Sequence, residues 1–113
     1  MISHTNFDQI KTFEAFDNRY TAPLHGFKDA NDFYIRASCQ NFLSPINVPA
    51  LIVNAANDPF LTGPCYPKEL AKDHKHVHLE IPKRGGHVGF SLFNSEVNWM
   101  EKRAFEFISQ IQP

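Results

Sequence analysis

A continuous apolar run, residues 50–55 (Ala-Leu-Ile-Val-Asn-Ala), most limits what this chain can fold into. A strand that is buried on both faces of a parallel sheet has such a run, whereas a strand with one wet face alternates. Pro59 follows shortly afterwards, and proline ends a strand ladder because it has no N–H to donate. The run therefore predicts a strand inside a parallel α/β sheet.

A second strand is predicted over residues 76–81, where apolar and polar side chains alternate strictly. Strict alternation indicates one wet face, so this strand should lie at or near a sheet edge. Residues 68–73 can form a short helix between the two strands, and such a connection is parallel and right-handed. Two strands are too few for a stable parallel sheet, so the chain is expected to form only part of one.

Three further helices are predicted from the spacing of apolar residues and from capping side chains. They cover residues 3–16, 30–38 and 95–110, with Ser95 as the N-cap of the last. Between the first two, residues 16–27 have no clean period and are interrupted by Asp, Asn, Pro and Gly, which predicts a structured loop. The expected order of elements is that of an α/β protein.

Charge, hydropathy and cysteine content indicate which partners and which cellular location to expect. The formal net charge is −1 and the basic residues are scattered, so the sequence does not favour nucleic acid or an anionic membrane as a partner. No apolar run is long enough to span a membrane, and residues 1–6 do not read as a signal peptide. Cys39 and Cys65 are isolated, without C-x-x-C spacing. These features predict a cytoplasmic protein, and no cofactor is expected.

Asp58 and His87 are the candidate catalytic residues. Asp58 directly follows the first predicted strand, at the edge where open α/β sheets place their chemistry. His87 lies in a glycine-rich loop after the second strand. An aspartate that accepts the ring N–H of a histidine fixes its tautomer and leaves the other nitrogen as a general base. Taken singly, Asp58 before Pro59 is also typical of a turn, and His87 of a surface loop.

The order of these two residues matches that of α/β-hydrolases, in which serine, then Asp or Glu, then histidine follow along the chain. Such an enzyme also needs a serine in a G-x-S-x-G turn between a strand and a helix. No serine of this sequence lies between glycines, and neither cysteine takes that place. The chain is therefore expected to carry the acid and the base without the nucleophile or the oxyanion loop.

A zinc site on the second strand is an alternative. His76, His78 and Glu80 share one face of that strand, and histidine and glutamate are zinc ligands. A solvated strand face explains the same alternation. It is the preferred interpretation, because zinc sites usually draw their ligands from more than one element.

Long motifs surround both candidate residues and extend toward the start of the chain. They are residues 16–30, Tyr34, residues 37–38, Ile46, residues 48–49, residues 57–60 (Asn-Asp-Pro-Phe) and residues 85–90 (Gly-Gly-His-Val-Gly-Phe). Together these stretches resemble the C-terminal portion of the YheT-like α/β-hydrolases. That group includes the bacterial hydrolase YheT and the eukaryotic abhydrolase-domain proteins, and the resemblance covers nearly the whole chain.

The resemblance implies a serine carboxylester hydrolase that acts on ester or lipid substrates, with Asp58 as its acid and His87 as its base. It also implies the C-terminal half of an α/β-hydrolase fold, present as a single partial domain over residues 1–113. Residues 1–45 would form the helices and loop of a cap or insert. Residues 46–113 would supply the last strands, the two catalytic loops and the C-terminal helix.

Because the sequence contains neither nucleophile nor oxyanion loop, this chain alone is expected to be inactive. The expected partner is then the missing N-terminal half, or a second copy of the chain. The alternative is a truncated hydrolase remnant without catalysis. Such a remnant would act as an interaction or dimerising module through the strand edge and the apolar sheet face left uncovered.

Overall fold

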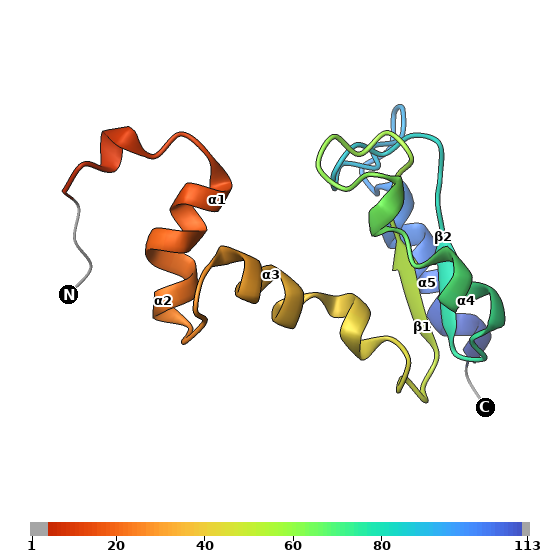
Figure 1. Cartoon of the computed structure of the whole chain (residues 1–113). Coiled ribbons are helices and arrows are strands. Elements are labelled where there is room, and N and C mark those ends of the chain that lie inside the picture. Colours follow the sequence, from red (N-terminus) through yellow and green to blue (C-terminus); the bar gives the residue numbers. More distant parts are fainter. Residues whose placement is uncertain (1–4, 112–113) are drawn as a thin grey trace. The chain divides into compact units, whose positions relative to one another are not determined.

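The computed structural model describes residues 5–111, and the chain divides into two compact units, Met1–Phe42 and Leu43–Pro113 (Figure 1). Each unit has buried side chains of its own and is described by itself. Within residues 5–111, every helix is too short or too polar to span a lipid bilayer.

The second unit is built on a two-stranded parallel sheet. β1 (Ala50–Val53) pairs in parallel with β2 (Val77–Glu80), each residue of one strand facing one residue of the other. α4 (Lys68–Asp73) lies between the strands in the chain. The predicted strand–helix–strand order and the parallel pairing are therefore confirmed, although both strands are shorter than the ranges 50–55 and 76–81.

Parallel pairing continues past the ends of the two strands. The N–H of Asn54 donates to the carbonyl oxygen of Glu80 (3.1 Å), and the N–H of Ala56 donates to that of Pro82 (2.8 Å). The two segments therefore leave the sheet together. The loops that hold the two candidate residues begin at the same edge, as expected for parallel strands.

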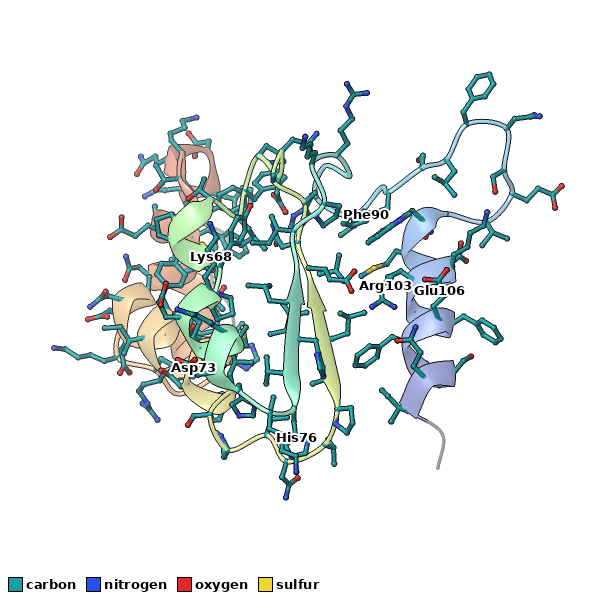
Figure 2. All side chains as sticks on the ribbon, turned by 90° about the vertical axis from the view of Figure 1, so that its right-hand side faces the viewer. Lys68, Asp73, His76, Phe90, Arg103 and Glu106 are labelled. Carbon is teal, nitrogen blue, oxygen red and sulfur yellow. The ribbon has the colours of Figure 1, made fainter. Side chains whose placement is uncertain are left out.

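Helices cover both faces of this sheet. In Figure 2, α4 with its labelled Lys68 and Asp73 lies on one side of the strands. α5 (Trp99–Ile111), with its labelled Arg103 and Glu106, lies on the other side. β1 was predicted to be buried on both faces, but all of its residues are only half-buried. A parallel strand normally reaches full burial between two neighbouring strands, and in the described part of the chain β1 has one.

The long helix begins later than predicted. The N–H of Glu101 donates to the side-chain oxygen of Asn98 (2.9 Å), and the N–H of Asn98 donates to the Glu101 carboxylate (2.7 Å). This reciprocal pair is a capping box, which satisfies two N–H groups that the helix itself cannot. Ser95 was wrong as the N-cap, because its hydroxyl is bonded within a turn to the backbone of Val97.

The first unit is helical. Its elements are η1 (Phe7–Gln9), α1 (Phe13–Phe16), the π-helical turn η2 (Asp17–Thr21), α2 (Ala22–Leu24), α3 (Ala30–Ala37) and η3 (Cys39–Phe42). α3 confirms the helix predicted over 30–38. The single helix predicted over 3–16 is wrong, since non-helical residues separate η1 from α1. Residues 3–4 of that prediction lie outside the described residues.

The loop predicted over residues 16–27 is also wrong for most of its length, because helical turns continue to Leu24. Tyr20 is buried, and its ring lies 5.1 Å from that of Phe16. This aromatic packing holds a segment in helical form that its local sequence does not favour. Pro23 closely follows the π-helical turn, because α2 continues η2 without a break.

Candidate active site

Asp58 is a buried carboxylate held by the loop that follows β1. Its residue is 7% exposed, and its side chain is fully shielded from solvent. One carboxylate oxygen, Oδ1, accepts hydrogen bonds from the N–H groups of Phe60 (2.8 Å) and Leu61 (3.0 Å). Asp58 therefore forms the turn that its position before Pro59 indicated. The same bonds fix the direction of its carboxylate.

Opposing effects set the acidity of this carboxyl. Burial raises the pKa of Asp58, because it disfavours the charged form. The N–H groups of Leu61 and Phe60 lower it, and so does the neighbouring His87 ring. The bonds outweigh burial, so the pKa of Asp58 lies below the ordinary value of 3.8 and the group is an anion at neutral pH.

His87 faces this anion. Its Nδ1 lies 3.0 Å from Oδ2 and 3.3 Å from Oδ1 of Asp58. A carboxylate can only accept, so Nδ1 must carry the proton in this pair, and in the neutral ring Nε2 keeps a free lone pair. The His87 side chain is 46% exposed, and no hydrogen bond to Nε2 occurs within residues 5–111. One ring nitrogen is thus bound to the acid and the other is available.

The loop that carries His87 has a defined shape. The carbonyl oxygen of Gly85 accepts the N–H groups of both Gly89 and Phe90 (3.1 Å each), which closes the loop around His87. Gly86 has a φ of 60°, a conformation that glycine adopts without steric cost. Its N–H donates to the side-chain oxygen of Asn57 at 3.0 Å.

Tight packing supports the base of this loop. A Cβ atom on Gly85 would come within 2.4 Å of the Phe90 ring and 2.9 Å of the Ala55 Cβ. Phe90 is buried, and its ring stacks on Trp99 of α5 at 5.7 Å between centroids. A pocket of about 410 Å³ lies beside this stack and is lined in part by Arg84. His87 does not line this pocket.

Two residues of the site had no role assigned from the sequence. Asn57 joins the acid loop to the histidine loop through Gly86. The Phe60 ring meets the His87 ring edge-on, with 5.0 Å between centroids. Both residues flank Asp58 in a motif that the sequence singled out. Asn57 directly precedes the acid in the sequence. Its short amide side chain was the feature that could have indicated a second bond between the two loops.

The structure does not support the zinc site. Glu80 instead receives three hydrogen bonds of 2.5–2.9 Å from Arg103, and these join β2 to α5. The same bonds raise the pKa of Arg103. The His78 ring packs against Phe107. No three His, Cys, Asp or Glu side chains within residues 5–111 are grouped closely enough to hold a metal ion.

No serine hydroxyl in the described range is hydrogen-bonded to His87. Ser95 and Ser109 both use their hydroxyls in bonds to nearby carbonyl groups, those of Val97 and Phe105. Ser91 lines the pocket beside the Phe90–Trp99 stack. The structure thus brings together the two residues predicted to be acid and base, and joins no serine to them.

Curated proteins match this chain along most of its length. It is 30% identical over 99 residues to an abhydrolase domain-containing protein of Dictyostelium discoideum, covering 88% of this chain and 25% of that protein. It is 33% identical over 101 residues to monoacylglycerol lipase ABHD2 of Bos taurus (84% and 24%). It is 31% identical over 111 residues to YheT of Escherichia coli strain K12 (96% and 32%).

The chain thus spans about a quarter to a third of the length of these relatives. No family model and no solved structure matches it. The similarity includes both an abhydrolase-domain protein and YheT, and the parallel strand–helix–strand unit fits the α/β class expected of them. Along most of its own length, the chain is therefore a relative of the abhydrolase-domain proteins and of YheT.

Proposed function

We propose that this chain supplies the acid and the base, Asp58 and His87, of a serine carboxylester hydrolase. The nucleophile and the oxyanion hole would come from another polypeptide segment, and this chain would form the C-terminal half of the complete fold. The observation that carries the proposal is the 3.0 Å contact between the buried Asp58 carboxylate and His87 Nδ1. Both residues follow parallel strands at one edge of the sheet, where α/β proteins place their chemistry.

In this mechanism the proton on His87 Nδ1 stays directed at Asp58. The lone pair on Nε2 takes the proton of a serine hydroxyl as its oxygen attacks the ester carbonyl carbon. The Asp58 anion stabilises the imidazolium that forms. Nε2 then gives its proton to the leaving alcohol, and a water molecule cleaves the acyl-enzyme by the same steps.

The proposed substrate is a carboxylic ester with an apolar part, such as a lipid. One relative is named a monoacylglycerol lipase. Around the base, apolar side chains are open to solvent, with Phe60 65% and Val88 77% exposed. A fatty acyl or glyceride group could cover these side chains and remove them from water.

A second candidate function is that of an interaction or dimerising module without catalysis. Within residues 5–111, β1 has a strand partner on one edge only. Phe105 and Ile108 of α5 are 74% and 61% exposed. An open strand edge and exposed apolar side chains are features of surfaces that pair with another chain.

The two functions can be separated by reconstitution. The purified chain would be mixed with the part of YheT outside the matched region, which is expected to hold the serine. Labelling by a fluorophosphonate probe and hydrolysis of a p-nitrophenyl short-chain ester would be measured for each component and for the mixture. The proposal predicts labelling of a YheT serine and turnover in the mixture, and neither with this chain alone.

Labelling of a serine in this chain alone would contradict the claim that its nucleophile lies elsewhere. A mixture that forms a stable complex without turnover would favour the interaction module. Oligomeric state, measured by light scattering on the same samples, separates a complex between the two chains from a dimer of this chain.

A further inference from the structure

The loop that holds Asp58 is closed by the hydroxyl of one tyrosine. The Tyr66 hydroxyl oxygen lies 3.0 Å from the carbonyl oxygen of Ala55 and 3.0 Å from that of Leu61. It also lies 3.2 Å from the side-chain nitrogen of Asn54, which donates to it. The hydroxyl therefore lies between a carbonyl group that precedes Asp58 in the chain and one that follows it, and it can donate its single proton to either.

The two carbonyl groups belong to residues that themselves bind Asp58. Ala55 accepts the N–H of Asp58 at 3.1 Å, and Leu61 donates its N–H to the Asp58 carboxylate at 3.0 Å. A shift of either residue would change the direction of the carboxylate. The Tyr66 hydroxyl resists a shift of whichever carbonyl group accepts its proton, and it lies within hydrogen-bond distance of both.

Residues close to Tyr66 in the chain hold it in place. Its N–H donates to the carbonyl oxygen of Gly63 (3.2 Å), its carbonyl accepts the N–H of Lys68 (2.8 Å), and the Lys68 ammonium lies over its ring. The Asn54 amide makes a second bond, to Ala55 at 3.1 Å. The cluster is thus anchored both to the end of β1 and to the start of α4.

We infer that Tyr66, assisted by Asn54, is a positioning residue for the acid of the proposed hydrolase. It keeps the Asp58 carboxylate directed at His87 and so keeps the proton of the histidine on Nδ1. This inference rests on the proposed function. It adds to that function a residue that touches neither the substrate nor the reacting atoms.

The test is the tautomer of His87, read from ring ¹⁵N shifts in the full-length chain at a pH where the ring is neutral. Wild type should hold mainly the Nδ1–H form, because Asp58 accepts that proton. Tyr66→Phe removes only the hydroxyl, and should lower the ratio of Nδ1–H to Nε2–H by about twofold or more, the effect of one weak net hydrogen bond. Asn54→Ala should shift it in the same direction.

Tyr34→Phe is the matched control. It removes a tyrosine hydroxyl that is bonded to Asp17 in the first unit, and it should leave the His87 ratio unchanged. If Tyr66→Phe does not fold, as judged by its amide spectrum, Asn54→Ala carries the test. A ratio unchanged in the folded variants, or an equal shift in Tyr34→Phe, would overturn the inference.

Asp58→Asn separates this inference from the proposed function. If Asp58→Asn shifts the ratio and the loop variants do not, the acid–base pair stands and the role of Tyr66 is wrong. If Asp58→Asn leaves the ratio unchanged, the pair itself is not formed in solution, and both the inference and the proposed function fail.

Discussion

Asn57 accepts a hydrogen bond from the N–H of Gly86 through its side-chain oxygen, at 3.0 Å. The bond joins the loop of the acid to the loop of the base directly, one residue before each of them. The two loops are therefore joined by two contacts: the one between Asp58 and His87, and this one beside it. The second contact limits how far the histidine loop can move from the acid.

Asn57→Ala should loosen the histidine loop. The Gly86 N–H would lose its partner, so its hydrogen exchange should become faster. The free energy of unfolding should fall by about 0.5–1 kcal/mol, the usual net value of one exposed hydrogen bond. Amide exchange by NMR measures the first effect and urea unfolding the second. Asn31→Ala, on the exposed surface of α3, should leave Gly86 exchange unchanged. Unchanged protection of Gly86 in Asn57→Ala would show that this bond does not restrain the loop.

Gly85→Ala should destabilise the second unit. The added methyl group would overlap the Phe90 ring and approach the Ala55 Cβ at 2.9 Å. Overpacking of this kind costs roughly 1–3 kcal/mol. Gly63→Ala is the matched control, since its added methyl group would meet nothing within 4 Å. Thermal unfolding of both variants is the measurement, and equal midpoints would contradict the packing described for Gly85.

The sequence was sufficient to predict the elements that a single hydrophobic pattern defines. The apolar run and the alternating run both form strands, and the two strands pair in parallel. The segment before Leu24 could not be predicted in this way. Tyr20 packs against Phe16, four residues earlier, which is a helical spacing, but the Asp, Asn, Pro and Gly of this segment argued against a helix. The contact of Tyr20 with Phe7 lies beyond the reach of local spacing. The start of α5 was missed because Ser95 was preferred over the Asn98–Glu101 pair that caps it.

For the site, the sequence singled out the two residues that meet, Asp58 and His87. Their order and their positions after the strands carried that prediction. The residues that hold them could not be found from order alone. Tyr66 reaches the acid loop only because the chain turns back after Gly63, and no periodicity of the sequence records that turn.

The stability of the chain should depend on Asp58 at acid pH. The pKa of Asp58 is lowered in the folded chain from 3.8, so below that value an unfolded chain binds a proton that the folded chain does not. The stabilisation is therefore present above about pH 4 and is lost as the pH falls through the folded value. Urea midpoints of wild type and Asp58→Asn between about pH 6 and pH 2.5 measure this. Their difference should shrink toward low pH, and a constant difference would contradict the lowered pKa.

Tyr34 should lose its proton at a higher pH than an ordinary tyrosine. Its hydroxyl donates to the Asp17 carboxylate at 2.5 Å, and this bond, with burial and the Asp17 charge, raises the pKa of Tyr34 to about 12. The folded chain keeps this proton when the unfolded chain loses it at its ordinary 10.0, so stability should fall between these values. Ultraviolet titration of tyrosinate in wild type and Asp17→Asn is the measurement. Asp17→Asn should bring the Tyr34 pKa back toward 10.0, and a titration that is the same in both chains would exclude the bond.

In the proposed function, His87 is oriented by Asp58 and is the base of an ester hydrolase. The most direct measurement is turnover of a p-nitrophenyl ester by the reconstituted mixture of this chain with the serine-bearing part of YheT. His87→Gln should lower turnover by about 10²-fold or more, the usual contribution of a general base. His25→Gln, at an exposed position directly after α2, should leave turnover unchanged. Turnover that survives His87→Gln at the wild-type rate would contradict the claim.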